Sequence, residues 1–164
     1  MNPILTAIRR ELGSIIAKMH RFDFGRSSDQ MAGMGGASLY MKDLVERLAF
    51  IKIEILSKFA VGDEKRTWSV AVNLPFTILT CLDRVLSLVK FVITTFVLHV
   101  SIVKPLGETG KLQLTTDMAE VEFGLSAFLI ESPQEKRGGN LEALGTDYKM
   151  LRGMRCVYKD GLCM

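Results

Sequence analysis

The stretch that decides the fold runs from Phe91 to Phe128 and reads FVITTFVLHVSIVKPLGETGKLQLTTDMAEVEFGLSAF. A long apolar helical pattern up to Val103 meets a turn rich in Pro and Gly, and a second helical pattern follows it. In that second pattern apolar residues recur at spacings of four and three, at Leu114, Met118, Val121, Leu125 and Phe128. Two helix patterns joined by a short turn predict a packed helical hairpin.

Two further helices are predicted towards the N-terminus. Asn2 can cap a helix that has Pro3 at its first position and ends near Arg21, with an apolar face at Ile4, Ile8, Leu12, Ile15 and Met19. Residues 24–37 are rich in Gly and Ser, which predicts a loop. The next helix is expected over 39–59, with its apolar positions at Met41, Leu44, Leu48, Ile51 and Ile55.

The remaining elements complete an all-α prediction. We expect a third helix from about Asp83 to Val103, and Pro75 leaves the form of residues 67–82 open as an uncertain insert. After a charged loop, Asn140 is expected to cap a last helix with its face at Leu141, Leu144, Tyr148, Leu151 and Met154. The pattern predicts one helical domain over 1–155, a helical bundle or short α-solenoid segment of about five helices, and an irregular tail over 156–164.

Composition excludes several classes. The chain has 164 residues, a net charge of +3 and a pI near 8.8, and its Lys and Arg residues are scattered, so nucleic-acid binding is not expected. Three cysteines without metal spacing favour reduced thiols in the cytosol over a secreted disulfide scaffold. Arg9, Arg10 and Glu11 stand where a signal peptide would need its apolar core.

No catalytic constellation stands out in the sequence. His20 and His99 are the only histidines, and neither has a cysteine, carboxylate or serine placed by pattern as a catalytic partner. Each is expected to have a structural role, and the glycines at 33, 35 and 36 are expected to form a flexible linker and not a phosphate loop. We therefore predict no enzyme activity, no cofactor, no metal and no small-molecule substrate.

The turn KPLGETG supplies the candidates for a partner interface. Pro105 ends one helix, and Gly107 or Gly110 can take a positive φ, so the turn needs no ligand to explain it. Loops at the ends of bundles are also common contact sites. The candidate interface residues are Lys104, Pro105, Gly107 and Glu108.

The run from Val85 to Val103 is also long enough to cross a bilayer. Lys90 lies inside it, where a charge costs roughly 2.5 to 3.5 kcal/mol on insertion scales. The polar residues Asp83, Ser87, Lys90, Thr94 and Ser101 draw a narrow stripe along one face, as they do on the inner helix of a bundle. A small integral membrane protein with a spanning helix at 85–103 is the alternative to the soluble bundle.

The amino-acid sequence of two long segments resembles that of the subunit 5 family of the conserved oligomeric Golgi complex, a vesicle-tethering assembly. The segments are MAGMGGASLYMKDLVERLAFIKIEIL (31–56) and VKFVITTFVLHVSIVKPLGETGKLQLTTDMAEVEF (89–123). The resemblance, to the family's C-terminal helical region, implies an all-α rod of stacked bundles on the cytosolic face of the Golgi membrane. It further implies a non-catalytic role in retrograde intra-Golgi transport, a peripheral membrane location, and contacts with other subunits of the tethering complex such as the sixth, seventh and eighth.

The sequence departs from the family at three places. The family's long N-terminal portion is missing, and no counterpart in the family can be placed for TWSVAVNLPFTILTCL (67–82). After LRGMR the family continues into further helices, whereas this chain closes with CVYKDGLCM. We therefore expect a fragment or a splice product.

Overall fold

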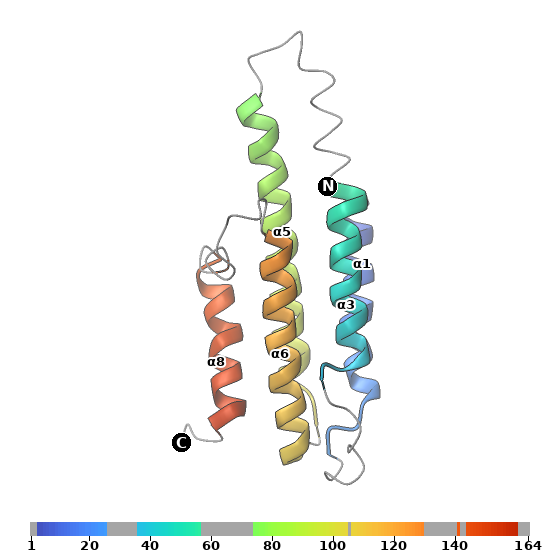
Figure 1. Ribbon diagram of the computed structural model, residues 1–164, viewed down its shortest axis with the longest axis vertical. Helices are drawn as coiled ribbons and strands as arrows, with labels where there is room; N and C mark the ends of the chain where they lie inside the picture. The colour runs from blue at the N-terminus through green and yellow to red at the C-terminus, as the bar shows by residue number, and fades with distance from the viewer. Residues whose placement is uncertain are drawn as a thin grey trace.

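Helices form the whole described framework of the chain. The computed structural model describes residues 3–25, 36–56, 74–104, 106–129, 141 and 144–160, and these contain five α-helices and no strand. In chain order the helices alternate in direction, so that each runs antiparallel to the next (Figure 1). The predicted all-α helical bundle is confirmed.

The bundle has three layers, with a central hairpin of α5 (Leu74–Ser101) and α6 (Glu108–Leu129). On one side of it pack α1 (Pro3–Ala17) and α3 (Leu39–Phe50), and on the other side packs α8 (Thr146–Asp160). Helix α1 contacts α5, α3 contacts α6, and α8 contacts both central helices. The central hairpin is therefore covered on two sides, which explains its long apolar sequence.

Both N-terminal helices end in a change of winding that the sequence pattern did not predict. The first helix continues from α1 into a 3₁₀ turn, Lys18–Arg21, and so ends where predicted. After Phe50, α3 passes into a π-helical segment, Ile51–Leu56, and the predicted end at Phe59 lies outside the described residues. Nearly the whole predicted apolar face of the first helix is buried, except for Ile4, which is 45% exposed.

Helix α5 begins nine residues before the predicted start at Asp83. Pro75 is compatible with this start because it lies in the first turn, where a backbone N–H has no intrahelical partner. Residues 74–82 of the uncertain insert are therefore helical, and residues 67–73 lie outside the described part. Lys90, Thr94 and Ser101 are exposed, as the predicted polar stripe requires.

The last helix differs from prediction at both ends. Leu141 is helical, but Gly145 takes a φ of 62° and breaks the helix expected from Asn140, so that α8 starts at Thr146. The expected irregular tail is wrong for residues 156–160, which continue α8. Tyr158 packs partly against the core and extends the apolar stripe by one more turn, which gives the helix a reason to continue.

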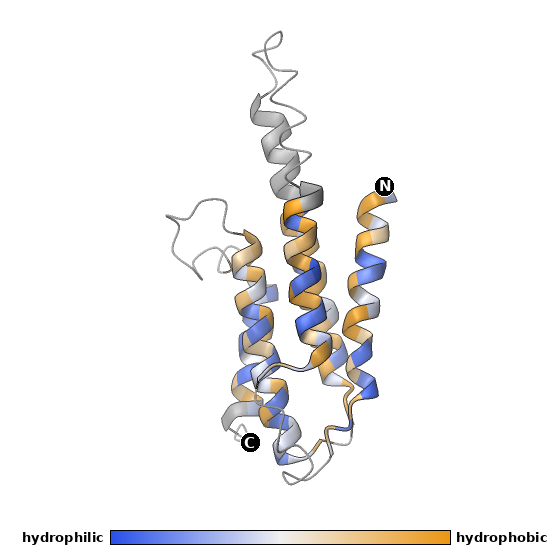
Figure 2. Cartoon of the chain, turned by 45° about the vertical axis from the view of Figure 1, so that its right-hand side comes forward, coloured by the Kyte–Doolittle hydropathy of each residue, from blue (hydrophilic) through white to orange (hydrophobic). Residues whose placement is uncertain are grey.

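One hydrophobic core joins the five helices. Figure 2 shows hydrophobic and hydrophilic faces along the helices, and the buried side chains come from every helix of the bundle. All five apolar positions predicted for α6 are at most 5% exposed. Each fully buried Leu, Ile, Val, Phe or Met side chain contributes about 1.5–3 kcal/mol relative to an exposed one, so this core is the main source of stability.

Candidate interaction surfaces

The predicted interface turn is anchored to the chain that follows the first helix. The backbone N–H of Gly107 donates to the carbonyl oxygen of Phe24 over 2.9 Å. A Cβ on Gly107 would lie 3.3 Å from the Gly25 carbonyl oxygen. Gly107 thus serves an internal contact, while Lys104 and Glu108 are exposed and Pro105 lies outside the described residues.

Gly110 allows the closest approach at this end of the bundle. A Cβ at this position would stand 2.0 Å from the carbonyl oxygen of Phe24, a distance that no side chain can occupy. The first turn of α6 therefore packs directly on the backbone that follows α1. This explains the glycine without any ligand, and it leaves Glu108, which pairs with Lys111 over 2.6 Å, on the outer side of the turn.

A buried carboxylate lies directly above this turn. Asp117 on α6 is fully buried and accepts hydrogen bonds from Ser38 N–H (2.8 Å), Ser38 Oγ (2.7 Å), Tyr40 Oη (2.6 Å) and Gln113 Nε2 (3.1 Å). Burial and the charge of Asp117 raise the pKa of Tyr40 well above its ordinary range, which keeps the phenol protonated as a donor. Gln113 also donates to the carbonyl oxygen of Gly36 over 2.9 Å.

This Asp117 network (Ser38, Tyr40, Gln113 and Asp117) joins the start of α3 to α6. Four donors satisfy the carboxylate, which a buried charge requires. Beside it, the ring of Phe22 lies 5.5 Å from that of Tyr40 and 6.4 Å from that of Phe24. The sequence analysis missed the network, although one signal was available: Asp117 falls on the apolar face of its helix, between Leu114 and Val121.

The structure also brings the two histidines together. His20 Nε2 lies 2.7 Å from His99 Nδ1, with ring centroids 5.0 Å apart, so one ring nitrogen donates a hydrogen bond to the other. This contact ties the 3₁₀ turn after α1 to the last turn of α5. Burial and then the charge of His20 lower the pKa of His99. The expected structural role suits this pairing, which the sequence analysis did not foresee.

Charged pairs link the outer edges of neighbouring helices. Between α1 and α3, Lys18 pairs with Asp43 over 2.9 Å and Arg47 pairs with Glu11 over 2.8 Å. Between α6 and α8, Glu122 accepts from both Tyr148 and Arg155. The two exposed pairs between α1 and α3 contribute about 0–1 kcal/mol each, so they orient these helices more than they stabilise them, whereas the contacts of Glu122 are part-buried.

A metal site and a membrane-spanning helix are the two alternatives to an interaction surface. Within the described residues, no group of three or more His, Cys, Asp or Glu side chains is arranged to hold a metal ion. One helix of the described part, over Arg84–Ser101, is long and apolar enough to cross a membrane, and 33% of that stretch is buried within the bundle. Its apolar residues Leu88, Val92 and Phe96 lie in the core, whereas Leu98 is 60% exposed, so the stretch has one side in the core and one side exposed.

Comparison with known proteins gives the resemblance a firm basis. The chain is 28% identical over 155 residues to conserved oligomeric Golgi complex subunit 5 of Arabidopsis thaliana, and 29% identical over 156 residues to the same subunit of Mus musculus. Each match covers 94% of the chain. The chain is similar to subunit 5 of the conserved oligomeric Golgi complex. The resemblance predicted from the sequence is thereby confirmed.

The subunit 5 relatives are much longer than this chain. It spans 17% of the length of the Arabidopsis subunit 5 and 16% of the mouse one. No protein-family profile matches the chain, and no solved structure matches it. The similarity therefore concerns one helical segment of subunit 5.

Proposed function

We propose that the chain is a non-catalytic part of a Golgi vesicle-tethering complex and acts through protein–protein contacts in retrograde transport within the Golgi. The observation that carries this proposal is the similarity to subunit 5 along 94% of the chain in both an animal and a plant relative. On this proposal it works at the cytosolic face of the Golgi membrane as a peripheral component, together with other subunits of the complex.

The architecture is suited to binding. A core shared by all five helices makes a rigid scaffold, and helical faces supply contact area while charged residues supply specificity. Of the predicted interface residues, we propose Lys104 and Glu108 as partner contacts, because they are exposed beside an internally anchored turn. Gly107 would hold that turn in place.

Co-precipitation of the tagged full chain tests the proposal. The cytosolic pool and carbonate-washed membranes are collected in parallel, and other tether subunits are expected with the soluble pool. A chain that stays in washed membranes without those subunits would instead support the alternative of a spanning helix at 85–103. A variant with Lys104→Glu and Glu108→Lys tests the turn, and unchanged recovery of subunits would remove these two residues from the interface.

A further inference from the structure

The charges of the bundle are unevenly distributed between its helices. Within residues 3–21, four Arg and Lys residues stand against Glu11 alone, and residues 84–104 contain Arg84, Lys90 and Lys104 and no acid. Helix α6 is the opposite, since it carries four acids and Lys111 as its one base. The acid of the first segment is engaged elsewhere, because Glu11 pairs with Arg47 of α3.

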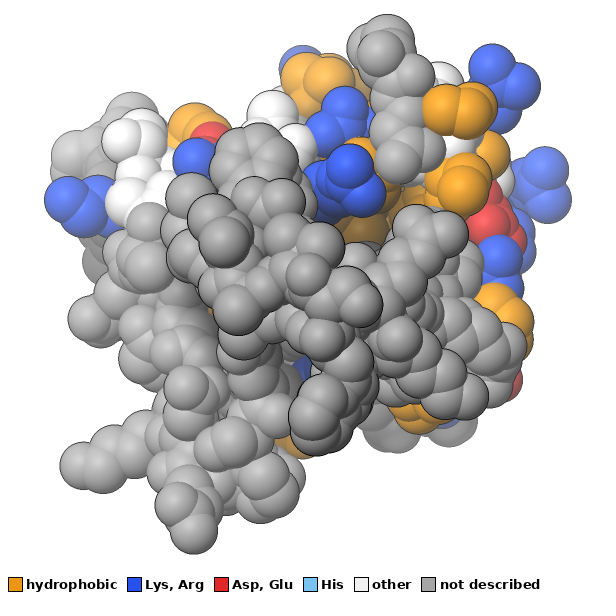
Figure 3. Space-filling view, turned by 90° about the horizontal axis from the view of Figure 1, so that it is seen from above, with side chains coloured by type: hydrophobic (Ala, Val, Ile, Leu, Met, Phe, Trp, Pro, Cys, Tyr) orange, Lys and Arg blue, Asp and Glu red, His pale blue; other side chains and the backbone are white. Residues whose placement is uncertain are grey.

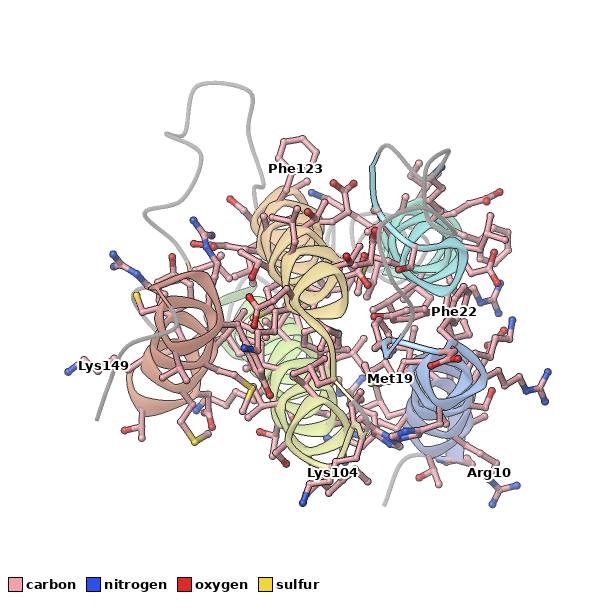
Figure 4. The ribbon with its side chains drawn as sticks, turned by 90° about the horizontal axis from the view of Figure 1, so that it is seen from below. Arg10, Met19, Phe22, Lys104, Phe123 and Lys149 are labelled. Atoms are coloured by element: carbon pink, nitrogen blue, oxygen red, sulfur yellow. The ribbon has the colours of Figure 1, made fainter. Side chains whose placement is uncertain are left out.

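The two basic segments lie side by side and parallel. Arg9 Nη2 donates to Ser87 Oγ over 2.5 Å, a Cβ on Gly13 would lie 3.8 Å from the Phe91 ring, and His20 meets His99. These three contacts hold α1 and α5 in register along their lengths. Figure 4 shows Arg10 and Lys104 pointing to the same side of the molecule, opposite to Phe123.

Large aliphatic side chains lie exposed between Lys90 and Lys104. Leu98 is 60% exposed and Ile102 is 59% exposed, and they stand four residues apart. We name this surface the α1–α5 face, and its members are the exposed residues Arg10, Ala17, Lys90, Leu98, Ile102 and Lys104. Seen from above, Lys and Arg side chains stand beside hydrophobic ones at the rim of the molecule (Figure 3).

Among the described residues, the cations of this face have no carboxylate partner. None of the ion pairs in the described part of the chain uses Arg10, Lys90 or Lys104. Lys90 and Lys104 lie on either side of Leu98 and Ile102 along the chain. Exposed aliphatic residues flanked by free positive charges match a partner with an apolar stripe flanked by acids.

We propose that the α1–α5 face binds an acidic amphipathic α-helix of another protein, which would be a subunit contact of the tethering assembly if the proposed function holds. Lys90 and Ile102 are twelve residues apart, about 18 Å along α5 at 1.5 Å per residue, which matches three to four turns of a partner helix. Leu98 and Ile102 form one i, i+4 ridge, the element that packs into the groove of another helix. The small side chain of Ala17 on α1 leaves room beside this ridge for a partner helix.

A membrane surface fits this face less well. Lipid recognition by charge typically uses clusters of roughly four to eight Lys and Arg residues close together, whereas this face exposes the three cations Arg10, Lys90 and Lys104, and the further exposed Arg84 lies six residues before Lys90 on α5. The three cations are also spread along the side of the bundle. A helix lying lengthwise can meet all three, and the acidic-helix proposal is therefore the one to test.

Peptide binding tests the proposal directly. A fluorescent synthetic helix of about 18 residues, long enough to hold helical structure, carries Leu at i, i+4 spacing with Glu on both flanks, and a matched peptide has Lys in place of Glu. We expect the acidic peptide to bind the full chain and the basic peptide not to bind. In Leu98→Glu we expect affinity to fall about tenfold or more, which corresponds to the loss of one good contact.

Matched variants show whether the peptide binds at the α1–α5 face or at any exposed leucine of the bundle. Lys104→Glu should weaken binding and reduce its salt dependence, whereas Leu112→Glu, at a position on α6 that is 69% exposed, should leave affinity unchanged. Circular dichroism confirms that each variant is folded. Equal affinity of the two peptides, or an equal loss in Leu112→Glu, would overturn the proposal.

The same experiments also test a lipid surface and a second copy of the chain as occupants of the α1–α5 face. Binding of the chain to vesicles containing phosphatidylserine, with no binding of the acidic peptide, would overturn the proposal in favour of a lipid surface. Self-association that Leu98→Glu abolishes in sedimentation would assign the face to a second copy and would equally overturn it. Peptide binding without co-precipitation of tether subunits would contradict the proposed function alone, and the reverse result would contradict the face alone.

Discussion

Removal of the Asp117 carboxylate is expected to be among the most damaging single changes in the chain. Asp117→Leu leaves three buried donors without an acceptor, namely Ser38 N–H, Ser38 Oγ and Tyr40 Oη. Each unsatisfied buried donor costs about 1–3 kcal/mol, so three of them together cost about 3 kcal/mol or more. We expect the free energy of unfolding to fall by about 3–5 kcal/mol, a large part of the roughly 5–15 kcal/mol available to a folded domain.

Urea unfolding followed by circular dichroism measures this loss. The exposed Asp43, which pairs with Lys18, supplies the control, and Asp43→Asn should cost less than about 1 kcal/mol. Removing the two side-chain donors as well, in the triple variant Ser38→Ala, Tyr40→Phe, Asp117→Leu, should recover part of the loss, because deleting both partners of a buried hydrogen bond is nearly neutral. The backbone N–H of Ser38 stays without its acceptor in both variants.

Two results would refute this reasoning. If Asp117→Leu lowers the free energy of unfolding by less than about 1 kcal/mol, the network does not carry the stability assigned to it. If the triple variant is less stable than Asp117→Leu alone, the loss comes from side-chain packing and not from unsatisfied donors. Midpoints are comparable only where the slope of the urea dependence is unchanged.

Three further predictions concern pH and glycine positions. The pKa of His99 is lowered in the folded state, so its contribution to the free energy of unfolding is present above the ordinary pKa of about 6.5 and is lost as the pH falls from there through the lowered pKa. Thermal melts between pH 7.5 and 5 should therefore show a falling melting temperature, and His99→Asn should reduce that fall. The raised pKa of Tyr40 has the opposite sign: stability should fall by up to about 1.4 kcal/mol per pH unit above pH 10, and urea titrations of Tyr40→Phe should lack that component. Gly110→Ala should lower the free energy of unfolding by about 1–3 kcal/mol or more, because the new Cβ collides with Phe24. Gly153→Ala, with open space around it in α8, should raise it by about 0.5–1 kcal/mol. Equal melting temperatures of the two variants would contradict the packing seen at Gly110.

The periodic parts of the fold could be predicted because each helix buries one regular stripe. The stripes of α3 and α6 follow spacings of three and four and are buried where the sequence pattern placed them. The ends of helices were harder to predict, since the start of α5 depends on where Pro75 is tolerated and the start of α8 on the left-handed conformation of Gly145. Such local choices are settled by tertiary packing and leave little trace in periodicity.

For the candidate surfaces too, local features could be predicted from the sequence and contacts between distant residues could not. The exposure of Lys104 and Glu108 agrees with their position in a turn between helices. The histidine pair and the Asp117 network join residues 75 to 79 positions apart, and no single-sequence spacing reveals such contacts. What the sequence does contain is a polar residue out of place, Asp117 on an apolar face, and a buried network is a common reason for one.

The side-by-side pairing of α1 with α5 and of α3 with α6 also sets the order in which the chain can fold. Ser38 precedes its partner Asp117 by 79 residues, so a ribosome adding roughly 5–20 residues per second needs roughly 4 to 16 s to supply the second half of that contact. During this time the α1–α3 hairpin exposes the apolar faces that α5 and α6 will later cover. Until α6 has emerged, the N-terminal half of the bundle therefore exposes apolar surface of the kind that makes folding intermediates prone to aggregation.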